Sequence, residues 1–225
     1  MILQKGTTLY RYCLGTNIPP EWSTEYHSPE YHSDAYGEKN QIGAFFFYTD
    51  EETARNVLGA AIRKAEERGE TYDRNTITSC TTTDDINLLD LTGCVRPVQM
   101  LNTLHDEGID VLTSEFVRHL NGEFTFDTVR GYHEFIMENE LSDDRFVKCD
   151  MRNCAAKIDD FFQWLVGYTG QVMTDFGNGI PFKRELQAKG YEGYQFMEEK
   201  YTPTICLFNA EKLTAPNHVV QTINN

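Results

Sequence analysis

The segment over residues 181–213 constrains the fold of this chain more than any other. Pro181 and Gly190 are the residue types that favour the start and the end of a short helix, so we predict a helix between them. Two strands are predicted next, over 194–197 and 204–208, joined by a short acidic turn. The second strand contains the unbroken apolar run ICLF, which is typical of a strand covered on both faces. We therefore expect this strand at the centre of the fold.

A second segment predicts a strand that leads directly into a helix. The strand, residues 44–48, is almost wholly aromatic. The four residues that follow it, TDEE at 49–52, fit a capping box at a helix start, and the helix is predicted to continue to about Arg68. Its apolar residues recur at helical spacing: Ala54, Val57, Leu58, Ala61, Ile62 and Ala65. We expect an amphipathic helix that packs against a sheet.

The rest of the chain adds strands and a block of helices. Further strands are predicted over 8–13, 76–82 and 86–91. The middle of the chain, about 95–175, has apolar residues at helical spacing and predicts an inserted helical block. A chain of 225 residues suits one domain of this kind. We expect a single α+β domain over residues 1–225.

The charge of the chain argues against nucleic acid as a partner. There are 35 acidic and 20 basic residues, a net charge of −15, and no cluster of lysine and arginine stands out. An acidic surface could serve solubility, attract a basic partner or mimic DNA. No apolar run approaches the roughly 20 residues of a membrane span, and the N-terminus lacks the apolar core of a signal peptide. We expect a cytoplasmic protein without membrane contact, with export by another route left open.

The cysteines and histidines do not predict a metal site. The six cysteines include no Cys-x2-Cys pair, so free thiols are expected. Cys149 and Cys154 have no histidine nearby, and His27 and His32 are spaced too loosely for a convincing ligand pair.

Three blocks of this sequence, taken together, resemble ADP-ribosyltransferase-like proteins. They are LYRYC near the N-terminus, GAFFFYTDEETARNVLGAA from Gly43, and KRELQAKGYEGYQFMEEKYTPTICLFNAEKL from Lys183. The resemblance is to the small bacterial and phage-associated branch, the polyvalent-protein type. It implies a split-sheet core built from about 7–93 and 181–213, in which two small sheets clasp extended NAD. The polar, aromatic loop over 14–42 would then be a mobile lid over the NAD cleft.

The resemblance implies four candidate residues for NAD binding. Arg11 occupies the first-strand position that holds the ribose or nicotinamide end, and its guanidinium suits diphosphate or ribose hydroxyls. Tyr12 is adjacent and faces the opposite way in a regular strand. The aromatic that stacks on nicotinamide corresponds to Phe47, or to Tyr48 if the strand is offset by one residue. Strand alternation allows only one of these two to line the cleft.

The catalytic acid is where the chain departs from the family pattern. Thr204 stands where the family has a glutamate on a late strand, and a threonine cannot carry that charge. Glu198 and Glu199 lie a few residues earlier, in the acidic turn. Either a turn acid substitutes, or Arg11 and Thr204 support a weaker reaction, or the protein binds without catalysis.

The function implied by the resemblance is that of an NAD-dependent ADP-ribosyltransferase or NAD glycohydrolase. NAD would be the substrate, and the acceptor would be an unidentified protein or small molecule. The branch suggests a toxin or another factor in conflict between bacteria and phages. Two alternatives stay open: a catalytically degenerate binding module on the same scaffold, and an acidic inhibitor that mimics DNA. Acids clustered on one face would favour the inhibitor, whereas a polar cleft around Arg11 would favour NAD chemistry.

Overall fold

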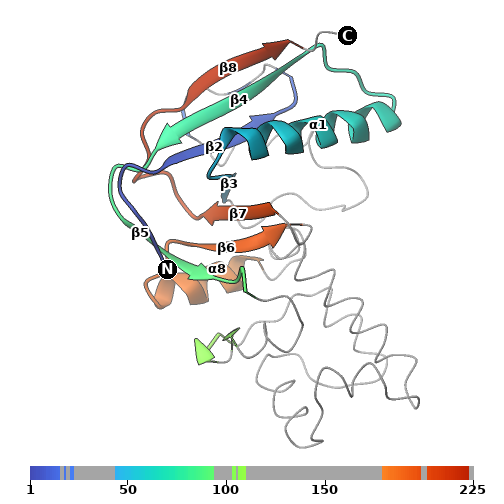
Figure 1. Ribbon diagram of the computed structural model, residues 1–225. Coiled ribbons are helices and arrows are strands. Elements are labelled where there is room, and N and C mark those ends of the chain that lie inside the picture. The colour runs from blue at the N-terminus through green and yellow to red at the C-terminus, as the bar shows by residue number, and fades with distance from the viewer. Residues whose placement is uncertain are drawn as a thin grey trace, which may run out of the picture.

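The computed structural model of the protein has two sheets with helices beside them, a mixed α/β arrangement (Figure 1). This agrees with the α+β class expected from the sequence. The structure describes residues 1–15, 18, 21–22, 44–93, 103–104, 106–109, 179–198 and 202–222.

The larger sheet has five strands in the order β1-β5-β6-β7-β3, and the smaller has three in the order β2-β4-β8. Neighbouring strands are antiparallel except for the parallel pair β5 and β6. The strands are β1 (Ile2–Leu3), β2 (Thr8–Cys13), β3 (Phe45–Phe47), β4 (Arg74–Thr81), β5 (Ile86–Asp90), β6 (Gly193–Glu198), β7 (Thr202–Leu207) and β8 (Asn217–Thr222), and the helices are α1 (Glu51–Glu67) and α8 (Gly179–Ala188).

The two sheets share an apolar core. Figure 1 shows the three-stranded sheet above the five-stranded sheet, with α1 beside the upper sheet and α8 below the lower one. Leu9 and Cys80 of the smaller sheet join Phe47, Ile205 and Leu207 of the larger sheet in one buried cluster. The opposite face of the smaller sheet packs against α1. At the level of these residues, apolar side chains fill the space between the two sheets.

Helix α1 forms as the sequence predicts, with its start one residue later than the expected capping box. Asp50, not Thr49, is the N-cap, and its carboxylate accepts a hydrogen bond from the Thr53 amide at 2.6 Å. Ala54, Leu58 and Ala65 are buried against β2 and β4. The predicted apolar stripe is thus the face that holds the helix on the sheet.

Strand β7 is an interior strand of the larger sheet and is buried, as its apolar run predicts. It lies between β6 and β3, and every residue from 204 to 208 is buried. The approach of β6 is so close that a Cβ on Gly193 would lie 2.0 Å from the carbonyl oxygen of Cys206. Gly190 follows α8 with a φ of 82°, as expected of a residue that ends a helix, whereas α8 begins two residues before Pro181.

Two connections between the sheets run side by side and hold them together through the backbone. They are the turn from β4 to β5 and the longer segment from β7 to β8. Thr82 and Leu213 form a β-bridge between them. The Thr83 amide donates to the Lys212 carbonyl at 2.8 Å, next to this bridge.

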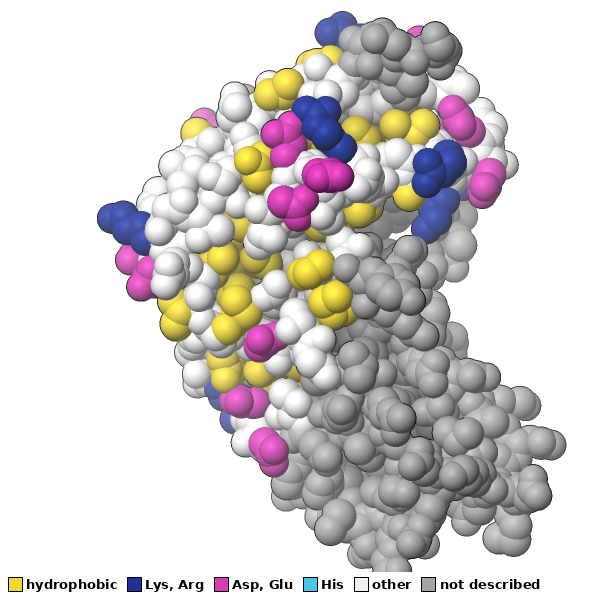
Figure 2. Space-filling view, in the orientation of Figure 1, with side chains coloured by type: hydrophobic (Ala, Val, Ile, Leu, Met, Phe, Trp, Pro, Cys, Tyr) yellow, Lys and Arg dark blue, Asp and Glu magenta, His cyan; other side chains and the backbone are white. Residues whose placement is uncertain are grey.

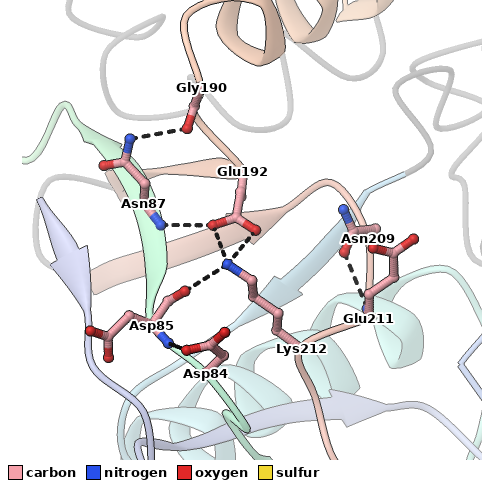
Figure 3. A network of polar contacts seen from close by, with 8 residues as sticks. All are labelled: Asp84, Asp85, Asn87, Gly190, Glu192, Asn209, Glu211 and Lys212. Carbon is pink, nitrogen blue, oxygen red and sulfur yellow. Dashed lines mark hydrogen bonds and ion pairs between the residues drawn. The ribbon is translucent and has the colours of Figure 1, made fainter.

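Side chains reinforce this junction (Figure 3). Lys212 Nζ donates to the Asp85 carbonyl at 2.8 Å and forms an ion pair with Glu192, with a shortest distance of 2.8 Å. Glu192 in turn accepts a hydrogen bond from the Asn87 amide at 3.1 Å. One lysine and one glutamate therefore tie both connections to the start of β6 and fix how the two sheets meet.

Strands β1 and β8 were not predicted. Strand β1 has only two residues, too few for a period, and β8 reads NHVVQT, in which polar residues surround two valines. The helical block predicted over 95–175 lies almost wholly outside the described residues. None of the described helices is long and apolar enough to cross a membrane.

Most of the loop predicted as a lid, 14–42, also lies outside the described residues. Trp22 is described, and its indole N–H donates to the Thr214 carbonyl at 2.8 Å. Its ring meets Phe45 and Phe47 edge-on, with centroid distances of 5.6 and 5.5 Å. This part of the loop is therefore packed against the core.

Candidate functional site

Arg11 points from β2 toward the side where the two sheets face each other. Along β2, Leu9 belongs to the core between the sheets, whereas Tyr10 and Tyr12 pack in the cluster against α1. Alternate residues of a strand share a face, so Arg11 lies on the side of Leu9 and away from α1. Tyr12 faces the opposite way from Arg11, as strand alternation predicted.

The Arg11 guanidinium has no hydrogen bond or ion pair with any residue that the structure describes. Arg11 is partly buried, and desolvation lowers the pKa of its guanidinium. An arginine nevertheless keeps its charge at neutral pH. The structure thus holds a positive charge in a partly dry position without a carboxylate from the described residues to balance it.

The described groups that interact with the Arg11 charge are thiols and phenol hydroxyls, not carboxylates. Its charge acts on the thiols of Cys13 and Cys80 and on the hydroxyls of Tyr12 and Tyr48. Burial raises the pKa of Cys80 to about 12, and the opposing effect of Arg11 is smaller. A thiol with so high a pKa stays protonated and cannot serve as a counterion.

Arg11 begins a row of three polar side chains that crosses the smaller sheet. Arg11 pairs with Thr78 in the register of β2 and β4, and Thr78 pairs with His218 in the register of β4 and β8. Residues directly opposite in antiparallel strands share a face, so all three lie on the face turned away from α1. The Thr78 hydroxyl and His218 Nδ1 are 2.8 Å apart, within hydrogen-bond distance.

Phe47 and Tyr48 are both core residues, on opposite faces as strand alternation requires. Phe47 is fully buried between the sheets, and Tyr48 is 5% exposed in the cluster against α1. The Tyr48 backbone also exchanges two hydrogen bonds with that of Tyr10, at 2.7 and 2.8 Å. Neither ring presents a free face in this structure.

The structure does not bring Thr204 to the side of Arg11. Thr204 pairs with Phe196, and residue alternation places it on the face of β7 opposite Ile205, which belongs to the core between the sheets. It is 1% exposed, and its hydroxyl lies 3.4 Å from the Thr202 carbonyl oxygen. Glu198 ends β6 and pairs with Thr202, while Glu199 lies outside the described residues.

Of the predicted site residues that the structure describes, Arg11 lies on the face between the sheets without a hydrogen bond or ion pair to a described residue, and Thr78 and His218 share that face. Sequence reasoning missed both of these residues. Thr78 falls within a correctly predicted strand, but its neighbour across the sheet is visible only from the register. His218 could have been found only by assigning β8, whose two adjacent valines are the single β-favouring signal in that segment.

Charges are interspersed on the face shown in Figure 2. Acidic and basic side chains both occur over the described part of this face. Within the described residues, no three histidine, cysteine or acidic side chains come together as they would around a metal ion.

Comparisons with known proteins do not identify this site. No protein-family model matches the chain, and no curated protein or solved structure matches it either.

Proposed function

We propose that the protein binds NAD between its two sheets, with Arg11 as the contact for the phosphates, on an ADP-ribosyltransferase-like core. Two observations support this proposal beyond the resemblance of the sequence. The architecture of two sheets is compatible with a split-sheet core. Arg11 occupies the first strand of the smaller sheet and faces the larger one, which is the position expected of a residue that holds NAD.

The unbalanced charge of Arg11 carries the proposal. A cation that is partly withdrawn from water and has no counterion among the described residues costs free energy, and a bound anion would offset that cost. The diphosphate of NAD supplies two negative charges, and a guanidinium can bind phosphate oxygens through two parallel hydrogen bonds.

The proposed reaction breaks the bond between the nicotinamide nitrogen and the ribose. Positive charge develops on the ribose as nicotinamide leaves with the bonding electrons, and a carboxylate nearby would stabilise it. Water as the acceptor gives ADP-ribose, free nicotinamide and a proton; a protein or small-molecule nucleophile gives an ADP-ribosylated product and the same leaving groups. Glu199 is our candidate for the carboxylate, with Glu198 as the second.

A binding module without catalysis is the second candidate, and the position of Thr204 favours it. The residue that aligns with the family's glutamate is a buried threonine on the wrong side of β7 for the Arg11 site. The acidic inhibitor is not supported by Figure 2, where the described charges of both signs are mixed.

Measurements of NAD affinity and of nicotinamide release on the same preparations distinguish an enzyme from a binding module. For an enzyme we expect Glu199→Gln to lower turnover by roughly 10²-fold with little change in NAD affinity, because the charge acts mainly in the transition state. Glu211→Gln, at an exposed position between β7 and β8, is the matched control and should release nicotinamide at the wild-type rate.

Each outcome decides between the candidates. NAD binding without nicotinamide release over many hours identifies the binding module. Release that is insensitive to Glu199→Gln and to Glu198→Gln removes both glutamates from the mechanism. Absence of NAD binding by the wild type contradicts the proposed function altogether.

A further inference from the structure

Strand β8 is an edge strand of the smaller sheet within the part of the chain that the structure describes. The order of this sheet is β2-β4-β8, so β8 pairs with β4 along one side. The opposite edge strand, β2, is linked to the end of β3 by the β-bridge between Tyr10 and Tyr48. Figure 1 shows β8 at the outer margin of the fold, beyond β4. Among the described strands, β8 is therefore the one in this sheet to which a further strand can be added.

Two adjacent valines of β8 are exposed, one on each face of the sheet. Val219 is 47% and Val220 is 42% exposed. Val219 pairs with Ile77, which packs against α1, and Val220 pairs with the adjacent Thr76, so the two valines lie on opposite faces. An antiparallel strand that faces water ordinarily places polar side chains on its solvated side. A strand added beside β8 would cover part of both valines at once.

The sequence of β8 has none of the residues that keep edge strands from pairing with other chains. It reads NHVVQT, without a lysine, an arginine, an acidic residue or a proline. Arg55 of α1 donates a hydrogen bond to the Gln221 side chain and is paired with Glu51, so this contact adds no unbalanced charge. When His218 is neutral, β8 is thus an uncharged strip on a chain with a net charge of −15.

This uncharged strip suits a second copy of the same chain. Two copies that each carry a charge of −15 repel each other over most of their surfaces, whereas β8 can meet β8 without like charges in opposition. A basic partner would gain more from the acidic residues elsewhere on the chain than from an uncharged strand.

We propose that two copies of the chain associate by antiparallel pairing of β8 with β8 about a two-fold axis. The axis is perpendicular to the sheet, so residues directly opposite each other lie on the same face. The central registers place Val219 or Val220 opposite its own counterpart in the other copy. The two three-stranded sheets then form one continuous sheet. This inference does not depend on NAD binding.

The pairing should be weak and should stop at two copies. About five residues of each strand would pair, which buries less than the roughly 1,200 Å² of a stable interface, so we expect a dissociation constant of roughly 10–100 µM. Pairing occupies the β8 edge of both copies, and the other edge strand of the sheet is already bridged to the end of β3. The assembly is therefore a closed dimer.

The test is sedimentation of the full chain at about 1 to 300 µM, a range that spans the expected dissociation constant. Val219→Lys and Val220→Lys should each weaken the dimer by more than about tenfold, because they bring two lysines close to each other at the two-fold axis. Ile2→Lys is the matched control: it makes the same substitution at a 54% exposed residue of β1, an edge strand of the larger sheet. It should leave the dissociation constant within about twofold of the wild type.

Two further measurements use the wild type alone. A rise in salt from about 50 to 500 mM should strengthen the dimer, because it screens the repulsion between the two acidic chains. Amide hydrogen exchange over residues 217–222 should slow as the protein concentration rises, whereas exchange in β1 should not change.

The outcomes decide for or against the dimer. A monomer at all concentrations overturns the inference, and so does a dimer that resists both valine substitutions or is lost with Ile2→Lys. Weakening by salt would show that ion pairs hold the copies together, and growth beyond two copies would contradict the closed pairing. Melting temperatures show whether the variants are folded; if the lysine variants are not, concentration-dependent protection of residues 217–222 supports the inference and its absence overturns it.

Discussion

Two cations differ in how the described residues compensate their charge: Lys212 at the junction between the sheets, and Arg11 on the inner face of the smaller sheet. Lys212 has a full set of partners: the Glu192 carboxylate and the Asp85 carbonyl, both at 2.8 Å. Its pKa is raised, mainly by the hydrogen bond to Glu192. Arg11 has no such partner among the described residues, and desolvation lowers its pKa.

This difference assigns the two cations to different tasks. The charge of Lys212 is compensated inside the chain, so it contributes to the junction that holds the sheets. The charge of Arg11 has no counterion among the described residues, and we propose that a bound phosphate offsets its cost. The predictions below test this contrast, beginning with the largest expected effect.

A carboxylate introduced at the buried position 204 should be the most harmful to stability. Thr204→Glu introduces the residue expected from the family pattern. Its carboxylate would lie at a position that is 1% exposed and that pairs with Phe196 on the neighbouring strand. We expect unfolding free energy to fall by more than about 3 kcal/mol, measured by urea denaturation. Thr204→Val, which keeps the shape, should cost much less; an equal cost for both would show that the charge is not the cause.

Removal of Arg11 should weaken NAD binding more than any of the other substitutions. We expect Arg11→Ala to weaken NAD binding by roughly ten- to a hundredfold, equivalent to about 1.5–3 kcal/mol for a charged hydrogen-bonding group. Arg63→Ala removes the same charge from an exposed position on α1 and should change the affinity by less than about threefold. Equal losses in the two variants would mean that only net charge matters.

Removal of Lys212 should lower the stability of the fold and leave NAD affinity nearly unchanged, the reverse of what we expect for Arg11. Lys212→Met removes the ion pair with Glu192 and the donor to the Asp85 carbonyl, and we expect a loss of about 1 kcal/mol in unfolding free energy. The loss is modest because about a third of each paired side chain is exposed, at 34% and 31%. NAD affinity, measured in parallel, should change by less than about threefold. A large loss of affinity at unchanged stability would contradict the contrast between the two cations.

The exclusion of water around Arg11 can be tested through the pKa of the neighbouring thiol of Cys80. Burial raises the pKa of this thiol from 9.0 to about 12. Between pH 8 and 9.5 the unfolded chain loses the proton and the folded chain keeps it, so stability falls as pH rises, by about 0.8 kcal/mol for this group. Urea denaturation under reducing conditions should show that Cys80→Ala has a weaker pH dependence than the wild type. Parallel curves would indicate that Cys80, and with it the environment of Arg11, is wetter than the structure implies.

The sequence predicted those elements that carry a clear period or an apolar run. The helix that became α1 has both a cap and a stripe of apolar residues, and β7 has three consecutive apolar residues that Phe208 continues. Such signals are local. For most of these helices and strands, the observed ends lie within two residues of the predicted ones. The N-cap of α1 is Asp50 instead of the predicted Thr49. The difference of one residue arises because both side chains are suitable caps.

The candidate site was less predictable because it depends on register between distant strands. Arg11, Thr78 and His218 are far apart in the sequence and meet only through the pairing of β2, β4 and β8. The burial of Phe47 and Tyr48 was equally hidden, because an aromatic strand looks the same whether its rings stack on a ligand or fill a core. Strand alternation predicted that the two rings diverge, but could not tell what each would meet.

The central claim, that the Arg11 charge is reserved for a phosphate ligand, is tested most directly by comparing the stability of wild type and Arg11→Met with and without NAD. Without NAD, the variant should be as stable as the wild type or more stable by up to about 1 kcal/mol, because it lacks the desolvated charge. With NAD at a hundred times its dissociation constant, the wild type should gain about 2.7 kcal/mol and the variant much less, so the order of stability reverses. If NAD stabilises both proteins equally, or stabilises neither, the claim is contradicted.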